Sequence, residues 1–233
     1  ETKNSYSIRV RTTDNSGSFY EESFTITVND LNETPTDISL DTLNVNENVS
    51  SGTTVGSLSS TDPDSGDTFT YTLVSGDGDT DNTSFAISGA NLNTNTALDY
   101  ETKNSYSIRV RTTDNSGSFY EESFTITVND LNETPTDISL DTLNVDENVS
   151  SGTTVGSLSS TDPDSGDTFT YTLVSGDGDT DNTSFAISGA NLNTNTALDY
   201  ETKNSYSIRV RTTDNSGSFY EESFTITVND LNE

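Results

Sequence analysis

The segment TDPDSGD occurs twice, at residues 61–67 and 161–167, and it crowds three carboxylates into one short stretch. In the first copy these are Asp62, Asp64 and Asp67, with a proline between the first two. Anions so close together repel one another unless a cation lies among them. The segment therefore predicts a cation site, and carboxylate oxygens are the ligands that calcium prefers.

Four other acidic segments accompany this one in a fixed order: NEN or DEN, LDYE, TTDNSG and DLNE. Most of them fall at expected strand ends or in turns, where their carboxylates can converge at the end of a domain. Calcium takes six to eight oxygen ligands, whereas magnesium uses fewer protein ligands and zinc favours His or Cys. The chain has neither His nor Cys, so calcium is the metal that these segments favour.

The acidic segments recur because the whole chain repeats. Residues 101–200 copy residues 1–100 with one change, Asn46 to Asp146, and residues 201–233 copy residues 1–33. A period of 100 residues suits one small domain rather than one unit of a solenoid. The proline-containing segment DLNETP gives the best linker signal in the period. We therefore predict complete domains at 34–133 and 134–233, with 1–33 as the C-terminal two-strand fragment of another, and we expect the sequence to be an excerpt from a longer chain.

The composition excludes several classes of partner. Asp and Glu number 39 against 9 Lys and Arg, for a formal net charge of -30. A nucleic-acid-binding protein needs a basic face, and an anionic membrane surface would repel this chain. No apolar run reaches the length of a membrane span, so we expect neither nucleic acid as a partner nor direct membrane insertion.

The elements that must position the acids are expected to be strands, because apolar residues alternate with polar ones. In SYSIRVRTTD, for example, Tyr106, Ile108 and Val110 share one face. In TTVGSL, Val55 and Leu58 both face inward only if a bulge shifts the alternation. The other inward positions that we expect are Ile38, Leu40, Leu43, Val45, Phe69, Tyr71, Leu73, Phe85, Ile87, Phe124, Ile126 and Val128. About seven such strands per period predict an all-β fold of two-sheet sandwiches.

The ordered acidic segments resemble the motifs of the cadherin repeat family, over the whole length of the chain. Cadherin repeats bind calcium between successive domains through an xEx glutamate, LDRE, a DxNDN linker, DxD and an AxDxxG aspartate. The matching positions here are Glu147, LDYE at 198–201, DLNET at 130–134, DPD at 162–164 and the TTDNSG segment around Asp214. The resemblance implies tandem seven-stranded Greek-key sandwiches (cadherin/Ig-like), joined end to end by calcium-binding linkers.

The resemblance also implies a ligand set for each linker. For the complete junction the ligands are Glu47, Asp99, Glu101, Asn132, Glu133, Asp162, Asp164 and Asp214, together with the carbonyls of Leu131 and Thr134. For the preceding junction they are Glu1, Asn32, Glu33, Asp62, Asp64 and Asp114. Asp167 is a weaker candidate, because it stands where the family supplies a backbone oxygen. The family has Asp where this linker has Glu133, and the chain has no Trp, so the Trp-anchored strand exchange of vertebrate adhesive cadherins is not expected.

The predicted function is a calcium-rigidified spacer or adhesion array in a large surface or secreted protein of bacterial type. Its partners would be calcium and adjacent repeats of the same chain, and its location would be extracellular. The alternative is a module that binds glycans or other copies of itself and forms filaments.

Two other interpretations of the acidic residues are not favoured. Asp77, Asp79 and Asp81 imitate the start of an EF-hand loop, but Ser88 stands where its Glu is needed, so an inter-strand loop is preferred. Paired carboxylates also serve glycosidases, but no nucleophile with an adjacent base is present, and we expect no enzyme.

Overall fold

The computed structural model describes residues 3–232, and the chain divides into two compact units, residues 1–130 and 131–233. The described elements are β-strands and two short 3-10 helices, Asn82–Ser84 and Asn182–Ser184. Among the described residues, no helix is long and apolar enough to cross a membrane. The expected all-β fold is confirmed.

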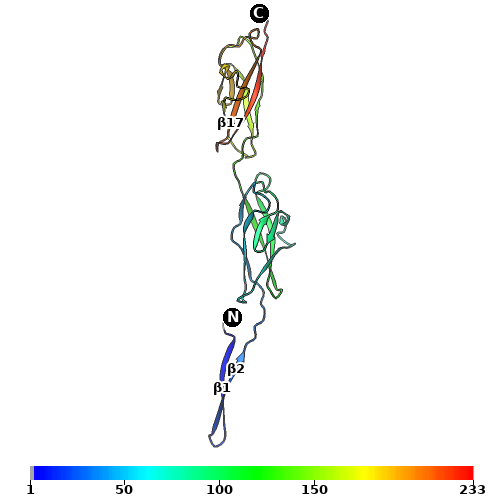
Figure 1. Ribbon diagram of the computed structural model, residues 1–233, viewed down its shortest axis with the longest axis vertical. Coiled ribbons are helices and arrows are strands. Elements are labelled where there is room, and N and C mark those ends of the chain that lie inside the picture. Colours follow the sequence, from blue (N-terminus) through cyan, green and yellow to red (C-terminus); the bar gives the residue numbers. More distant parts are fainter. Residues whose placement is uncertain (1–2, 233) are drawn as a thin grey trace. The chain divides into compact units, whose positions relative to one another are not determined.

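Each unit contains one sandwich of two four-stranded sheets (Figure 1). In unit 1 the first sheet has the order β3 (Asp37–Leu40), β5 (Thr54–Thr61), β8 (Asn91–Thr94) and β7 (Phe85–Ser88). The second has the order β4 (Asn44–Asn46), β10 (Phe119–Asn129), β9 (Ser105–Thr113) and β6 (Thr70–Leu73). All pairs are antiparallel except β4 with β10, which is parallel.

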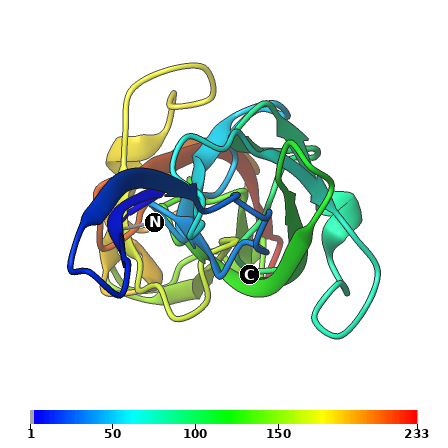
Figure 2. The same cartoon turned by 90° about the horizontal axis from the view of Figure 1, so that it is seen from below.

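Unit 2 repeats this topology. Its first sheet has the order β11 (Asp137–Leu140), β13 (Thr154–Thr161), β16 (Asn191–Thr194) and β15 (Phe185–Ser188). Its second sheet has the order β12 (Asn144–Asp146), β18 (Phe219–Asn229), β17 (Ser205–Thr213) and β14 (Thr170–Leu173). Unit 1 also contains the two-stranded hairpin β1 (Ser5–Thr13) and β2 (Phe19–Thr27). Figure 2 shows that in each unit the loop around the 3-10 helix projects from the sandwich.

The segment DISLDTLNV forms two strands rather than one, and each sandwich has eight strands where about seven were expected. Strands β3 and β4 belong to different sheets, and the chain crosses between the sheets at residues 41–43. Leu43 lies in this crossing and is 44% exposed, so the expectation that it faces the core was wrong. Ile38 and Val45, on the two strands, are buried.

The expected bulge in TTVGSL is confirmed. The pairing of β5 with β8 shifts register between Thr54 and Gly56, and Val55 and Leu58 are both buried. A bulge adds one residue to a strand and so resets the alternation of its side chains. Gly56 is needed there, because a Cβ atom would lie 2.9 Å from the backbone carbonyl oxygen of Thr42.

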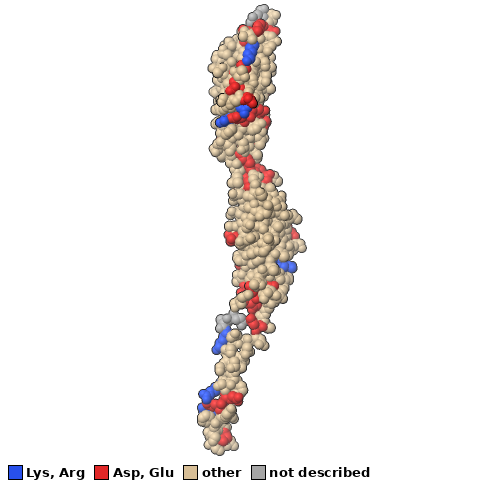
Figure 3. Space-filling view, viewed as in Figure 1, with Lys and Arg blue, Asp and Glu red and all other residues tan. Residues whose placement is uncertain are grey.

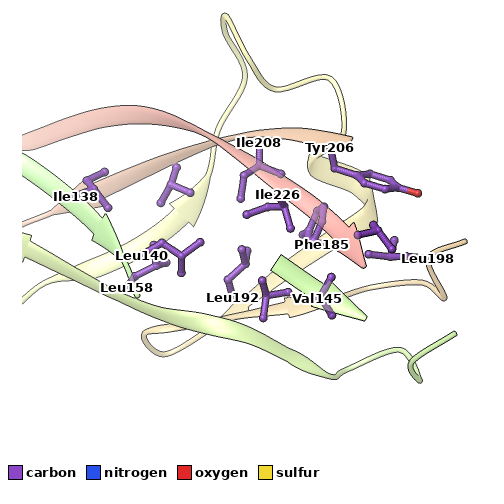
Figure 4. Packing of buried hydrophobic residues seen from close by; sticks show 13 residues of the cluster. Ile138, Leu140, Val145, Leu158, Phe185, Leu192, Leu198, Tyr206, Ile208 and Ile226 are labelled. Carbon is purple, nitrogen blue, oxygen red and sulfur yellow. The ribbon is translucent and has the colours of Figure 1, made fainter. Parts of the chain in front are cut away.

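The core of each sandwich consists of the alternating apolar residues of both sheets. In unit 2, Tyr206, Ile208 and Val210 alternate along β17 and are buried, and the ring of Tyr206 packs edge-on against Phe185 with centroids 5.8 Å apart. Figure 4 shows Ile208, Ile226 and Phe185 among the side chains that meet in the space between the two sheets. The removal of this apolar surface from water, at roughly 25 cal/mol per Å², holds the sheets together and fixes the strand ends that carry the acids.

Candidate metal centre

The first acidic cluster of unit 1 consists of Glu47, Glu101 and Asp130. One carboxylate oxygen of each residue lies within 4.8 Å of the others. Glu47 follows β4 and Asp130 follows β10, and because these two strands are parallel neighbours, both residues emerge at the same edge of the sheet. The turn of LDYE brings Glu101 to this edge. The structure thus assembles side chains from three segments that are far apart in sequence.

The glutamate at the centre of this arrangement is almost fully buried. Glu47 is 1% exposed, and its Oε2 accepts a hydrogen bond from the backbone N–H of Tyr100 at 2.9 Å. In unit 2 Glu147 is also 1% exposed and accepts hydrogen bonds from the N–H groups of Tyr200 at 3.0 Å and Leu231 at 2.7 Å. These bonds fix the orientation of the carboxylate.

Other acidic side chains surround this glutamate. Glu147, Asp199 and Glu201 form the corresponding cluster of unit 2, within the same 4.8 Å limit. In unit 1, burial raises the pKa of Glu101, and the charges of Glu47 and Asp130 raise it further. Packing anions in this way has an energetic cost that a bound cation would remove.

The second cluster of unit 1 consists of Asp62, Asp67 and Asp114, again with one oxygen from each within 4.8 Å. Its assembly follows from strand register, because the first residue of β6 pairs with the last residue of β9. The TDPDSGD turn precedes β6 and Asp114 follows β9, so the turn and Asp114 meet at the same place. Burial raises the pKa of Asp67, and the charges of Asp62 and Asp64 add to this effect.

Asp114 is held by the turn that it begins. Its Oδ1 accepts hydrogen bonds from the N–H groups of Ser116, Gly117 and Ser118 at 2.8, 2.6 and 2.9 Å. Burial acts to raise the pKa of Asp114, but these hydrogen bonds and one from Asn32 outweigh burial and lower the pKa. The charged form is therefore the one that the fold stabilises, as a metal ligand requires.

Residues of each linker bind to the second cluster. In unit 1 the side-chain amide of Asn32 donates to Oδ2 of Asp114 at 3.0 Å, and the N–H of Glu33 donates to Oδ2 of Asp64 at 2.7 Å. Asp30, Glu33 and Asp64 also form a group within 4.8 Å.

In unit 2 Asn132 donates to Asp214 at 3.1 Å, and the N–H of Glu133 donates to Asp164 at 2.7 Å. Because the amide nitrogen of Asn132 makes this bond, its amide oxygen is the atom that could serve as a metal ligand. Burial and then the nearby charges of Asp164 and Asp214 raise the pKa of Asp162 and that of Asp167.

The donor atoms of these clusters fit a hard divalent cation. Oδ2 of Asp62, Oδ1 of Asp64 and Oδ2 of Asp162 are buried and have no hydrogen-bond partner within the part of the chain that the structure describes. Buried polar atoms are almost always paired, and an unpaired anionic oxygen is costly. Calcium accepts carboxylate, amide and carbonyl oxygens together, which is the donor set present here.

The basic residues of the sandwiches bind other acids. Arg109 and Arg111 both pair with Glu121, at 2.9 and 2.5 Å, and so offset the charge of an acidic neighbour on the sheet. Arg209 and Arg211 pair with Glu221 in the same way. Figure 3 shows that acidic side chains gather in dense patches rather than spreading evenly over the surface.

The loop that imitates an EF-hand is anchored by protein contacts. Oδ1 of Asp81 pairs with Lys103 at 2.5 Å, and Oδ2 accepts from the N–H of Ser107 at 2.8 Å. Asp79 caps its own loop by accepting from the N–H of Gly76 at 3.0 Å. The 3-10 helix that follows has three residues, far too short for an EF-hand helix. These contacts support the reading of an inter-strand loop.

The structure adds residues to the predicted ligand set. Asp30 and Asp130 were missed, although the linker motif DxNDN itself begins with an aspartate, which was the available signal. Asp67 joins its cluster as fully as Asp62 does, and Asp167 is the equivalent residue of unit 2.

Asp99, Glu1 and two backbone carbonyls complete the predicted ligand set. Asp99 lies in the LDYE turn, where its Oδ1 accepts from the N–H of Thr102 at 2.9 Å. Glu1 lies outside the described residues, and the carbonyls of Leu131 and Thr134 remain predictions.

Comparisons with known proteins agree with the sandwich fold described above. The family model described as "Cadherin domain" matches residues 41–129 and 141–229. Among solved structures, the chain is similar to protocadherin gamma B7 extracellular cadherin domains 1–4, with 26% identity over 98% of this chain and 58% of that chain and a TM-score of 0.68. A comparison with curated protein sequences found no match.

Two further structures show the same fold. The protocadherin gamma B4 extracellular domain is 23% identical, over 99% of this chain and 43% of that chain, with a TM-score of 0.64. The human desmocollin-1 ectodomain is 22% identical, over 99% of this chain and 49% of that chain, with a TM-score of 0.58. This chain thus spans about half the length of those ectodomains. Since the family model covers two stretches that together make up most of the sequence, the chain belongs to the cadherin family, a non-enzymatic family whose domains are extracellular parts of larger proteins.

Proposed function

We propose that the acidic clusters bind calcium ions, which link successive cadherin domains into a stiff extracellular array for adhesion. The observation that carries this proposal is the set of buried carboxylate oxygens of Asp62, Asp64 and Asp162 that find no hydrogen-bond partner among the described residues. They lie in segments that follow the calcium-binding order of the family.

The ligands of the second junction would come from both sides of the linker. We assign Glu47, Asp99, Glu101 and Asp130 to the upstream side, and Asn132, Glu133, Asp162, Asp164 and Asp214 to the downstream side, with the carbonyls of Leu131 and Thr134. This assignment is supported by the split within the linker itself. Asp130 belongs to the cluster of Glu47, whereas Glu133 is hydrogen-bonded to Asp164.

The first junction would use the equivalent positions Asn32, Glu33, Asp62, Asp64 and Asp114, together with Asp30 and Asp67.

The proposed stiffening of the linker follows from the neutralisation of its clustered carboxylates. Bound calcium supplies the positive charge that offsets repulsion among the clustered carboxylates. When the ligands are neutralised in this way, Asn132 and Glu133 stay docked on the downstream domain and the linker loses its freedom to bend. Extracellular calcium is abundant, so sites with a Kd of about 10⁻⁴–10⁻³ M would be filled.

An array of near-identical domains suits a spacer whose length matters more than any one domain. We propose that this segment holds an adhesive region away from a cell surface, or contributes to matrix assembly, in a larger surface or secreted protein of bacterial type.

Small-angle scattering of the chain, with about 1 mM calcium and then with chelator, tests the proposal. We expect the maximum particle dimension to be larger, and its distribution narrower, with calcium. Asp164→Ala should reduce this difference, whereas Asp137→Ala, which removes an equal charge from strand β11, should leave it unchanged. Identical scattering with calcium and with chelator in the unsubstituted chain would refute the proposal.

A further inference from the structure

A serine in the turn that begins at Asp214 binds the side-chain amide of the linker asparagine. The amide nitrogen of Asn132 lies 3.0 Å from Oγ of Ser218. The same nitrogen lies 3.1 Å from Oδ2 of Asp214 and 2.6 Å from the backbone carbonyl oxygen of Glu133. Three acceptors therefore surround the two N–H protons of this amide.

Ser218 is fixed in place by the aspartate of the same turn. Its N–H donates to Oδ1 of Asp214 at 2.9 Å, and its carbonyl accepts from the N–H of Asp214 at 3.0 Å. The preceding residue, Gly217, has a φ of 100°, which glycine adopts without strain. The turn thus holds the Ser218 hydroxyl and the Asp214 carboxylate as one fixed pair of acceptors.

Unit 1 contains the same arrangement. The amide nitrogen of Asn32 lies 3.0 Å from Oγ of Ser118 and 3.0 Å from Oδ2 of Asp114. It also lies 2.7 Å from the carbonyl oxygen of Glu33. The contact between the serine and the asparagine is therefore a feature of the repeat rather than of one domain.

The orientation of the amide follows from the chemistry of its neighbours. A carboxylate and a carbonyl can only accept hydrogen bonds, so the nitrogen of Asn132 rather than its side-chain oxygen must face them. A flipped amide would place its oxygen against the anionic oxygen of Asp214. The amide oxygen is thus left for the proposed cation site. In unit 1 Asn32 lines an open cavity of about 180 Å³ together with Asp30, Asp64, Ser65, Asp67 and Ser116.

We propose that Ser118 and Ser218 are positioning residues of the calcium sites, an inference that rests on the calcium function proposed above. Each hydroxyl supplies a second acceptor beside the aspartate of its turn. Two acceptors fix the plane of the asparagine amide, whereas one would let it rotate. The amide oxygen is then aligned before the ion arrives, through bonds that need no cation. Groups that orient a metal ligand can set metal affinity without touching the metal.

Hydrogen exchange in chelator tests the docking of the linker apart from calcium. Since the segment LNETPT occurs in both linkers, both copies of the serine are changed together. Ser118→Ala with Ser218→Ala should speed exchange at the backbone N–H groups of Glu33 and Glu133, which are bonded to the DPD turns. We expect exchange to be faster by about twofold to tenfold, the effect of losing one neutral hydrogen bond.

Two matched variants show whether the hydroxyl is responsible. Ser59→Ala with Ser159→Ala removes a hydroxyl from an exposed position of β5 and of β13, and should leave exchange in the linkers unchanged. Ser118→Thr with Ser218→Thr keeps the hydroxyl and should preserve slow exchange. The proposal would be overturned by alanine variants that exchange no faster than this control, or by threonine variants that exchange as fast as the alanine variants.

A change of the asparagine itself tests the orientation of the amide. Asn32→Asp with Asn132→Asp replaces the nitrogen by an anionic oxygen, which would face the carboxylates of Asp114 and Asp214. Exchange in the linkers, again in chelator, should accelerate at least as much as in the serine-to-alanine variants. Exchange as slow as in the unsubstituted chain would show that the nitrogen does not hold the linker, and would contradict the proposal.

Calorimetric titration with calcium separates the positioning role from the proposed function. Ser118→Ala with Ser218→Ala should raise the calcium Kd about tenfold, the lower end of the cost of losing a group that orients a metal ligand. Ser59→Ala with Ser159→Ala should leave the Kd unchanged. Faster exchange with an unchanged Kd would overturn the positioning role and leave the calcium sites standing. An unsubstituted chain that binds no calcium would overturn the proposed function, and this inference with it.

Discussion

The backbone N–H of Glu133 donates a hydrogen bond to Oδ2 of Asp164 at 2.7 Å, and Glu33 makes the same bond to Asp64, also at 2.7 Å. In each linker the backbone N–H of this glutamate thus binds a carboxylate of the DPD turn, beside the side-chain bond of the preceding asparagine. The other oxygen of Asp64, Oδ1, is buried without a partner among the described residues. One aspartate therefore positions the linker and, in the proposed site, would present its second oxygen to the cation.

Removing this carboxylate should loosen the linker without unfolding the domain. Asp164→Ala removes a proposed calcium ligand and the acceptor for Glu133, but Asp164 does not belong to the apolar core cluster. We expect weaker calcium binding, by tenfold or more, measured calorimetrically. The far-UV circular dichroism of the variant in calcium should match that of the unsubstituted chain.

The control Asp137→Ala should change neither property, because Asp137 lies on the exposed first position of β11. A globally unfolded Asp164→Ala variant would show that Asp164 has a structural role and would count against its assignment as a ligand.

The single difference between the two periods should have almost no effect on calcium. The side-chain oxygen of Asn46 accepts from the amide of Asn129 at 2.9 Å, and Oδ1 of Asp146 accepts from Asn229 at the same distance. Both residues are exposed and make the same bond. We expect Asn46→Asp and Asp146→Asn to change the calcium Kd by less than about twofold, or roughly 0.4 kcal/mol. A tenfold change would place this position within the site.

Much of this architecture could be predicted from sequence because it depends on the alternation of apolar and polar residues along each strand. The buried residues of β9 and β17, and the bulge that turns both Val55 and Leu58 inward, follow from the spacing of apolar side chains. The exposed position of Leu43 could not be predicted in this way, because it depends on the strand changing from one sheet to the other. Alternation within a segment does not reveal where the segment exchanges hydrogen-bonding partners.

The candidate site could likewise be predicted only in part. Which segments carry the clustered acids could be predicted from their order along the chain. That Asp130 joins Glu47 required the parallel pairing of β4 with β10, and that Asp67 joins Asp114 required the register of β6 with β9. Both are long-range pairings that no local pattern specifies.

The acidic loop that resembles an EF-hand should matter for stability rather than for calcium. Asp81 is tied to Lys103 and to the N–H of Ser107, and these bonds lower its pKa even though burial acts to raise it. Asp81→Ala removes both contacts and should destabilise its domain by about 1–3 kcal/mol in urea denaturation. The calcium Kd should be unchanged. A weakened calcium affinity with unaltered stability would instead place an ion in this loop.

The stability of the chain should depend on pH in opposite directions with and without calcium. The pKa values of Asp67, Asp162, Asp167 and Glu101 are raised in the folded state, mainly by burial and also by neighbouring carboxylates. Hydrogen bonds to these carboxylates offset part of each rise. A group with a raised folded-state pKa stabilises the fold at low pH, and its contribution is lost as the pH rises through that value. The calcium-free chain should therefore melt at a higher temperature at pH about 5 than at pH about 7.

In calcium the order should reverse, because protons compete with the cation for the same carboxylates. The lowered pKa of Asp114 does not affect this comparison, since its contribution is lost only below the ordinary value of 3.8. Melting temperatures measured by circular dichroism in both conditions check the prediction. The same pH trend with and without calcium would contradict it.

Calorimetric titration of the full chain with calcium tests the central claim most directly. The experiment is run at low salt and again at about 1 M salt, where the Debye length falls to about 3 Å and diffuse attraction to a chain of net charge -30 is screened. We predict saturable binding of more than one calcium ion per chain that persists at high salt, with a rise in unfolding free energy of about 2.7 kcal/mol at a hundredfold excess of free calcium over Kd. Heat that vanishes at high salt, together with melting curves that coincide in calcium and in chelator, would show that the acidic clusters are not calcium sites.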